Sequence, residues 1–468
     1  MKNIIIASTL ALFLTSCGGK TSNLVSFTKP VAAEESGGVV IAPAKHSLLN
    51  WDKDNIGVNI ALDSTNQKFK SHTLRLKASI SAEPVIVDGK IFVLTRDGYV
   101  TAFNENSLEQ LWTLDIVSKN SKSDYIWGGI AHHNGKLFVT NGSRTFGIVD
   151  MNNGNVIFSK QFPDILVTTP VIYGDIVMLQ TLGNQLYLFD SARKAVVWDH
   201  AGNPETLQGG LPIAPVVDKA GRALVAYTSG QVSLLDLHKR AELWQMDLSS
   251  DSTMPEYIAV NLAVSPVIEG VHGYLADNNG KIFKVNLENG AFAWKKDIDD
   301  VRTINVAANA LIMTTNGRQV IALDKMSGKI LWATYLAEKG KSRNKWDPID
   351  YVASLMVNDM LHIYASDGEH YVISLDNGSV VHKSYEAKKL SFVTVTDKIR
   401  MFDGKKILVS EPQKESRFKI FDKFKREPKE PKAEVIRDVT NEPKKQKSSW
   451  LKSFKFGQKK RDTKAEVK

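Results

Sequence analysis

Few residues in this chain have the type and spacing that a reaction centre needs. His132 and His133 form an adjacent histidine pair, but neighbouring residues on a strand point to opposite faces, so a shared metal ion is not expected. The chain has no Gly-x-Ser-x-Gly, phosphate-binding loop or His-Glu-x-x-His motif. Its many Asp-Gly pairs are explained by tight turns. The sequence therefore predicts neither a catalytic site nor a metal site.

The single cysteine, Cys17, is the residue with the clearest chemical context. An apolar stretch follows Lys2 and is too short to span a membrane as a helix, which is typical of a signal peptide. The segment Leu14 to Gly18 then resembles the bacterial lipobox, in which the cysteine thiol receives a diacylglycerol. A glycine directly after the cysteine resembles the signal that sorts lipoproteins to the outer membrane. We predict lipidation at Cys17 and a location on the periplasmic face of the outer membrane.

Between the two ends, one phrase of residues recurs. It consists of an apolar run, an Asp-Gly or Asn-Gly turn, a second apolar run, a glycine-containing turn and a closing residue that is usually aromatic. Successive copies close at intervals of 38 to 50 residues, at Trp112, Phe158, Trp198, Trp244, Trp294, Trp332 and His382. This period suits one propeller blade of four short strands. The sequence predicts an all-β fold, an eight-bladed β-propeller of four-stranded antiparallel blades.

The eighth blade is expected to be split between the two ends of the propeller. Residues 391–410 supply two or three strands and no closing aromatic. The missing outer strand is predicted from the N-terminal side, within Leu48 to Ala61 and Thr73 to Ala78. Such a split blade closes the ring and removes exposed sheet edges.

The closing tryptophans resemble the docking aromatics of the PQQ-like repeat. One large aromatic per blade wedges against the next blade and buries roughly 150–250 Å². We therefore predict a structural role, not a ligand cage, for Trp112, Trp198, Trp244, Trp294 and Trp332.

Quinoprotein alcohol and glucose dehydrogenases share this repeat, so an enzyme must be considered. The alcohol enzymes use a vicinal disulfide beside the cofactor, whereas this chain has one cysteine. No Glu, Asn and Asp set could be assigned to a calcium–quinone site either. We predict no cofactor and no catalysis, with a quinoprotein-like enzyme as an alternative.

A lipoprotein with a single eight-bladed PQQ-like ring is similar to the BamB family. Asn50 to Asp52 looks like a degenerate form of the lead-in found before blade one in that family. The resemblance implies a non-enzymatic scaffold for outer-membrane β-barrel assembly, a monomer within a complex. Its partners would be the POTRA domains of the barrel-insertion subunit and other assembly lipoproteins. Nucleic acid is not expected as a partner of an exported protein.

In the BamB family the partner surface lies on two loops before innermost strands. The first has a Leu-x-Leu-Arg-Gly pattern; here Leu207 and Gly209 fit it, while Gln208 replaces the arginine. The second has an Asp-x-Asp pattern, and here Asn261 and Ala263 replace both acids. The resemblance implies partner binding at these five positions without the family's charge pairing. A different envelope module, binding cell wall or polysaccharide or taking part in sensing, is the alternative.

The C-terminal tail holds the basic character of the chain. Residues 412–468 carry 19 Lys and Arg against 9 Asp and Glu, so residues 1–411 sum to a charge of −1 within a total of +9. We predict a largely disordered tail. Trp450, Leu451 and Phe454 lie near one face of a short segment, which would suit contact with a membrane or a partner, or a solvated tail.

The predicted domain organisation follows from these segments. Residues 1–16 form the signal peptide, 17–47 the lipidated cysteine and its tether, 48–411 the propeller, and 412–468 the tail.

Overall fold

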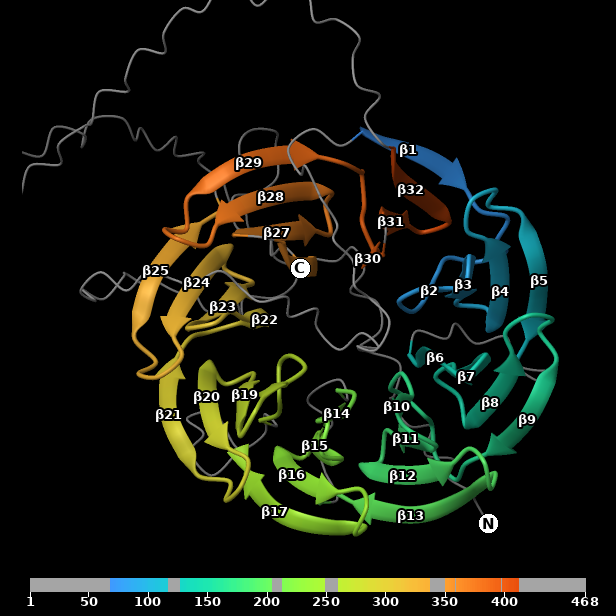
Figure 1. Cartoon of the computed structure of the whole chain (residues 1–468), viewed down its shortest axis with the longest axis horizontal. Coiled ribbons are helices and arrows are strands. Elements are labelled where there is room, and N and C mark those ends of the chain that lie inside the picture. The colour runs from blue at the N-terminus through green and yellow to red at the C-terminus, as the bar shows by residue number, and fades with distance from the viewer. Residues whose placement is uncertain are drawn as a thin grey trace, which may run out of the picture. The chain divides into compact units, whose positions relative to one another are not determined.

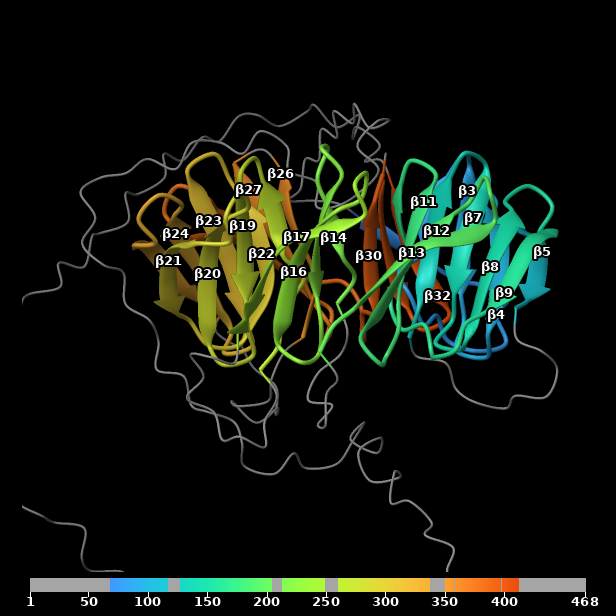
Figure 2. The same cartoon turned by 90° about the horizontal axis from the view of Figure 1, so that it is seen from below.

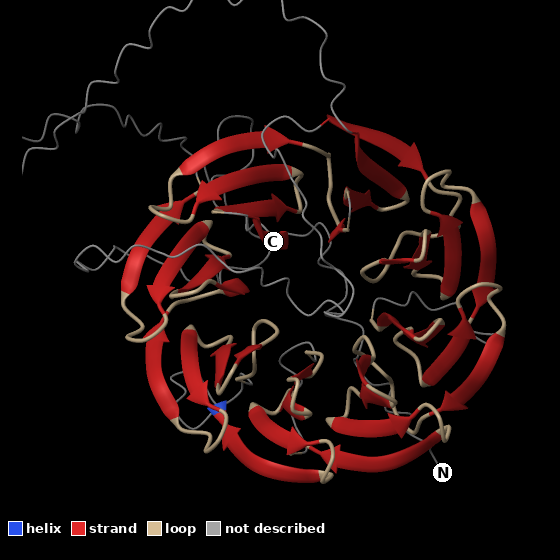
Figure 3. Cartoon of the chain, in the orientation of Figure 1, coloured by secondary structure: helices blue, strands red, loops and turns tan. Residues whose placement is uncertain are grey.

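The computed structural model describes residues 68–116, 127–203, 213–248, 260–336 and 350–411, apart from 358 and 397. These residues form eight four-stranded antiparallel sheets arranged as the blades of a ring (Figure 1). The elements drawn there are strands joined by loops almost throughout (Figure 3). The predicted eight-bladed propeller is confirmed.

Each of the first seven blades consists of four strands that follow one another along the chain. Blades 1 and 2 comprise β2 (Val85–Val87), β3 (Lys90–Leu94), β4 (Tyr99–Asn104), β5 (Gln110–Asp115), β6 (Gly129–His133), β7 (Lys136–Thr140), β8 (Thr145–Asp150) and β9 (Val156–Gln161). Blades 3 and 4 comprise β10 (Val171–Tyr173), β11 (Ile176–Gln180), β12 (Gln185–Asp190), β13 (Ala195–Ala201), β14 (Val216–Val217), β15 (Arg222–Ala226), β16 (Gln231–Asp236) and β17 (Ala241–Asp247). Blades 5 and 6 comprise β18 (Val267–Glu269), β19 (His272–Ala276), β20 (Lys281–Asn286), β21 (Phe292–Asp297), β22 (Val301–Val306), β23 (Ala310–Thr315), β24 (Gln319–Asp324) and β25 (Ile330–Tyr335). Blade 7 comprises β26 (Tyr351–Val357), β27 (Met360–Ala365), β28 (Glu369–Ser374) and β29 (Val380–Tyr385).

Blade 8 is the split blade. It combines β30 (Phe392–Val395), β31 (Ile399–Asp403) and β32 (Lys406–Glu411) with β1 (Lys68–Thr73) from the N-terminal side. β1 pairs antiparallel with β32, from Lys68 opposite Glu411 to Thr73 opposite Lys406. The N-terminal origin of this strand is confirmed, but its position was predicted wrongly.

The strand precedes the predicted stretch Thr73 to Ala78 and shares only Thr73 with it, while Leu48 to Ala61 lies outside the described residues. The reason is that the chain after Thr73 crosses to blade 1. Leu74 and Ile80 are both buried in the core cluster that joins blade 8 to blade 1.

Local sequence explains the regular blades. The pairs Asp88-Gly89 and Asn134-Gly135 both adopt positive φ angles, 48° and 68° in the first pair and 47° and 69° in the second. Two successive residues with positive φ are what a two-residue hairpin between twisted strands requires. The second and third strands of the blades carry most of the buried core. The fold is therefore set by repeated hairpins with apolar middle strands.

Candidate partner-binding face

The antiparallel blades give the ring two different faces, seen edge-on in Figure 2. One face carries the turns between second and third strands and the connections from each fourth strand to the next blade. We call it the loop face, and the opposite one the turn face. The four longest connections between blades, β5 to β6, β13 to β14, β17 to β18 and β25 to β26, all start and end on the loop face. The loop face therefore carries the longest connections between blades.

Two of the five predicted partner-binding residues lie on described parts of the loop face. Asn261 is only 5% exposed. Its amide N donates to Asn278 Oδ1 (3.0 Å), and its carbonyl accepts from the Asn278 amide N (2.9 Å). Ala263 is half-buried, and its amide N donates to the Ala276 carbonyl (2.8 Å). These two residues fix the incoming chain to the β19–β20 turn of their own blade.

The other three predicted residues, Leu207, Gln208 and Gly209, lie outside the described residues, as do Cys17, Trp450, Leu451 and Phe454. The chain that leads to the first three is held firmly. Gln231 Oε1 accepts from the Asn203 amide N (2.8 Å), and Asn184 Nδ2 donates to the Asn203 carbonyl (3.2 Å). Asn184 Oδ1 in turn accepts from the amide N and Oγ1 of Thr228, both at 2.9 Å. Buried amides of blades 3 and 4 thus fix the start of this connection.

Four aspartates gather beside Asn261, and sequence reasoning missed them. Asp277 begins the β19–β20 turn, Asp297 ends β21, and Asp299 and Asp300 follow it. The Ile298 amide N donates to the Gly280 carbonyl (2.8 Å), which draws the end of β21 onto that turn. A Cβ at Gly280 would lie 1.9 Å from Asp299 Oδ1, so the carboxylate rests on the glycine. We call these four residues the acidic cluster.

Burial and mutual repulsion both act on the acidic cluster. Burial raises the pKa of Asp277, and the charge of Asp297 raises it further, while Lys281 opposes them. Burial raises the pKa of Asp299, and the charges of Asp300 and Asp297 add to that effect. Like charges held close together disfavour ionisation of each one. The only sequence signal was the high density of aspartate between 297 and 300.

The closing tryptophans lie between blades. The indole Nε1 of Trp112 donates to the Met151 carbonyl of the next blade at 3.2 Å. The same bond recurs from Trp244 to Leu287 (2.9 Å), Trp294 to Lys325 (3.0 Å) and Trp332 to Leu375 (3.0 Å). Trp198 packs on the core cluster that contains Leu237 of blade 4. Each acceptor directly follows the third strand of its blade.

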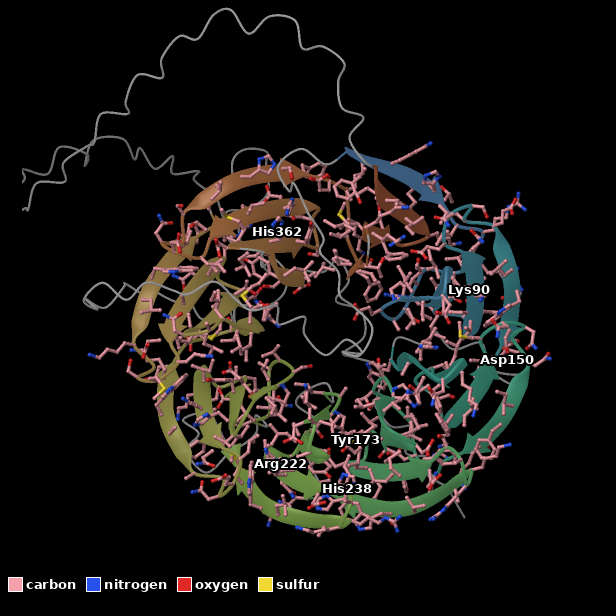
Figure 4. The ribbon with its side chains drawn as sticks, viewed as in Figure 1. Lys90, Asp150, Tyr173, Arg222, His238 and His362 are labelled. Atoms are coloured by element: carbon pink, nitrogen blue, oxygen red, sulfur yellow. The ribbon has the colours of Figure 1, made fainter. Side chains whose placement is uncertain are left out.

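Polar contacts on the turn face supplement this docking (Figure 4). Lys90 Nζ donates to Asn152 Oδ1 of the next blade (3.1 Å). Tyr173 Oη and His238 Nε2 form a hydrogen bond of 3.1 Å between blades 3 and 4. These groups join neighbouring blades on the turn face.

One arrangement has the order of a catalytic triad. His200 lies 2.7 Å through Nε2 from Glu242 Oε2 and 2.6 Å through Nδ1 from Tyr227 Oη. Tyr227 is completely buried between blades 3 and 4, and burial followed by the charge of Glu242 raises the pKa of its hydroxyl. A nucleophile must be reachable and easily deprotonated. Tyr227 is neither, so the triad serves packing.

Blade 7 holds a second buried histidine network. His362 Nδ1 lies 3.1 Å from His370 Nε2, and the ring of His370 stacks on Tyr364 with centroids 4.2 Å apart. Figure 4 labels His362 in this blade. Burial, followed by the charges of His370 and His382, lowers the pKa of His362 to about 3. His362 is therefore neutral at physiological pH.

Two features of the described residues bear on other functions. Within these ranges, no three His, Cys, Asp or Glu side chains are grouped to hold a metal ion. His132 and His133 both lie on β6. No helix of the described part has the length and apolar character to cross a membrane.

Comparisons with known proteins place the chain in a family. A family model described as "Outer membrane protein assembly factor BamB" matches residues 96–334 and 304–415. An uncharacterized protein of Rickettsia conorii is 27% identical over 79% of this chain and 89% of its own length. BamB of Yersinia pestis is 23% identical over 62% of this chain and 73% of its own.

The similarity extends to a solved structure. The crystal structure of BamB from Moraxella catarrhalis superposes with a TM-score of 0.61 at 16% identity, covering 74% of this chain and 99% of that one. At this identity, the match shows a common fold. The family model spans the repeats that build the ring, and the chain belongs to the BamB family of PQQ-repeat β-propellers.

Proposed function

We propose that this protein is a lipid-anchored, non-enzymatic scaffold of outer-membrane β-barrel assembly. It binds the barrel-insertion subunit, through the POTRA domains of that subunit, on the loop face. The observation that carries the proposal is the family match over residues 96–415 together with a closed ring that gathers its longest connections on one face. Relatives at 22–24% identity carry the name of an outer membrane assembly factor.

The geometry of the described residues supports a binding role over catalysis. Two buried titratable groups, His362 and Tyr227, contact other residues of the ring and are inaccessible to a substrate. A rigid ring that presents loops on one side is a common architecture for holding partners, because the scaffold fixes loop positions at low entropic cost. No cofactor is needed for such a role.

The anchor is tested separately from the scaffold role. Radiolabelled palmitate should be incorporated into the wild-type chain and not into Cys17→Ala, and only the wild type should fractionate with the outer membrane. Wild-type protein that carries no palmitate label and is found in the soluble periplasmic fraction would overturn the lipid anchor. That result would not decide the fold or the partner, which have their own tests.

The partner is tested by crosslinking in native envelopes. A tagged wild-type chain should recover the barrel-insertion subunit. A matched variant, Leu207→Asp with Gly209→Asp, should lose most of that recovery while its melting temperature stays unchanged. Recovery of cell-wall fragments or polysaccharide in place of the subunit would instead support the alternative function, an envelope module that binds one of these. That alternative stays open because Gln208, Asn261 and Ala263 replace the charged loop residues of the family.

A further inference from the structure

Blade 7 carries histidine at three positions where blades 1 to 6 carry hydrophobic side chains. The three are His362 on β27, His370 on β28 and His382, the closing residue, on β29. Strand register identifies the matching positions of the other blades, which hold aliphatic, Met, Phe, Tyr or Trp side chains in every case. In blade 6 they are Ile312, Val320 and Trp332. One blade therefore departs from the repeat at three matched positions at once.

The register places these histidines on the side of blade 7 that faces the split blade. His370 lies opposite Tyr364 and stacks on it, and His362 is two residues before Tyr364 on the same strand. His382 lies opposite the residue two after His370. Residues two apart on a strand share a face of the sheet. Tyr364 belongs to the core cluster that contains Met401 of blade 8, so the three histidines lie at the junction between blades 7 and 8.

A chain of hydrogen bonds links two of the histidines to a carboxylate. His362 Nδ1 lies 3.1 Å from His370 Nε2, and His370 Nδ1 lies 3.2 Å from Ser384 Oγ, which donates to Glu386 Oε1. His362 is 2% exposed and His370 is 5% exposed. Only one proton fits between the two ring nitrogens, because two N–H groups cannot donate to each other. Protonation of both rings therefore breaks the hydrogen bond that joins them.

The charges at this junction favour one protonated ring and disfavour two. Glu386 Oε1 lies 3.9 Å from His370 Nδ1, so a carboxylate faces one of the rings. Burial, followed by the charges of His370 and His382, lowers the pKa of His362. Blade 8 contributes apolar side chains to the shared core cluster, and its buried cation, Arg400, is paired with a glutamate of blade 1. A second positive charge would thus lie between like charges and apolar surface, which favours separation of the two blades.

We propose that the junction between blades 7 and 8 is a pH-sensitive closure of the ring: when mild acid protonates both His362 and His370, blade 8 separates from blade 7. Blade 8 stays joined to blade 1 through the ion pair of Arg400 with Glu105, so the ring opens on one side only. Because blade 8 combines β1 with β32, the opening lies beside the first and last strands of the ring. This inference goes beyond the proposed function, since it concerns the closure of the ring and assumes no partner.

Two cysteines introduced into blade 8 of the full-length chain test which junction opens. Met401 and Ile407 are both completely buried, Met401 in the core cluster shared with blade 7 and Ile407 in the cluster shared with blade 1. Met401→Cys and Ile407→Cys are labelled between pH 7.5 and pH 5.5 with a disulfide reagent that reacts in acid. Mass spectrometry separates the labelled peptide from that of Cys17. Each labelling rate is divided by the rate for the denatured chain at the same pH.

The normalised labelling of Met401→Cys should rise roughly tenfold from pH 7.5 to pH 5.5. A histidine with the ordinary pKa of 6.5 that takes its proton only on opening favours the open state by that factor. Labelling of Ile407→Cys should stay unchanged, because the junction with blade 1 remains closed. Equal rises at both positions would mean that acid unfolds the ring as a whole. That outcome, or the absence of a rise at position 401, would overturn the inference.

Two further variants, each combined with Met401→Cys, connect the opening to the histidine pair. His362→Gln keeps a side chain that forms hydrogen bonds but takes up no proton at these pH values, so the rise in labelling should disappear. His72→Gln is the control, because His72 lies on β1 of the same blade opposite Ile407, on the face towards blade 1, and the rise should remain. A rise that survives His362→Gln would contradict the proposal. Leu408→Cys, in the same core cluster as Met401, repeats the measurement if Met401→Cys fails to fold.

Discussion

The junction between blades 6 and 7 and the seam between blades 8 and 1 meet the same packing requirement with different chemistry. At the junction, Trp332 donates to the Leu375 carbonyl and lies over Gly378, where an added Cβ would be 2.4 Å from the ring. At the seam, β1 brings no tryptophan. Arg400 of β31, 1% exposed, instead forms an ion pair with Glu105 of blade 1.

The seam uses the corresponding positions of the same turn. Glu105 directly follows the third strand of its blade, as Leu375 does, and Leu108 stands where blade 7 has Gly378. Leu108 keeps the left-handed backbone, with φ of 60° against 72° for Gly378. The comparison indicates that this turn position needs a positive φ, and that glycine is used at position 378 because the Trp332 ring leaves no space for a Cβ. A charge pair takes over docking at the seam, where the closing strand has no tryptophan.

The largest difference should appear when each device is removed. Trp332→Ala should lower the free energy of unfolding by about 3–5 kcal/mol, because it leaves a cavity between two blades and an unpaired carbonyl. Urea unfolding followed by fluorescence and circular dichroism measures this loss. Phe292→Ala on the outer strand of blade 5 is the control; this residue is 39% exposed, and its loss should lower the free energy of unfolding by about 1 kcal/mol or less. Equal losses would contradict a docking role for Trp332.

At the seam, Glu105→Gln should lower the free energy of unfolding by about 3 kcal/mol, because it removes the carboxylate that neutralises the buried Arg400 guanidinium. Adding Arg400→Met should recover most of that loss, since a buried ion pair is replaceable by apolar side chains of similar volume. Urea unfolding of both variants measures the coupling. Additive losses in the double variant would mean that the two side chains act independently and that the seam is held by its apolar cluster.

The contacts at the seam could not be predicted from the sequence. The blade period and the tryptophan positions could be predicted from the sequence, because hairpin turns and closing aromatics are local signals. β1 was misplaced because its six residues, KFKSHT, contain a single apolar side chain, Phe69, and show no strand alternation. Arg400 and Glu105 are 295 residues apart, so nothing local connects them. The acidic cluster likewise forms only after the β20–β21 register brings two segments together.

Acid should weaken the molecule through blade 7, which packs against the split blade. His362 has a folded-state pKa of about 3, below its ordinary value of 6.5. The unfolded chain therefore binds a proton that the folded chain does not as the pH falls through 6.5. The free energy of unfolding has its full value above that pH and should fall by about 2 kcal/mol by pH 5.

The measurement for this effect is urea unfolding between pH 7.5 and 5. His362→Gln should flatten the decline, and His133→Gln, on the turn face of blade 2, should leave it as in the wild type. A wild-type stability that stays constant down to pH 5 would show that His362 titrates normally in the folded chain.

The smallest effect tests the requirement for a positive φ in the turn between the third and fourth strands of a blade. Lys194 occupies the glycine position in the blade 3 turn with φ of 55°, and the residue that closes blade 2 is Phe158 in place of tryptophan. Lys194→Gly should raise the free energy of unfolding by about 0.5–1 kcal/mol, because relief of the left-handed strain exceeds the added freedom of the unfolded chain. Ala192→Gly, in the same turn and without a positive φ, should lower it by a similar amount.

The seam provides the contrast that completes this test. Leu108→Gly relieves the same strain but removes a side chain that packs on the core cluster between blades 8 and 1, so we expect no gain, and a loss of about 1 kcal/mol, in urea unfolding. A gain at position 108 as large as that at 194 would mean that backbone strain alone decides the residue at this turn. A gain at 194 with a loss at 108 would mean that the neighbouring blade decides it, through what it places on the turn.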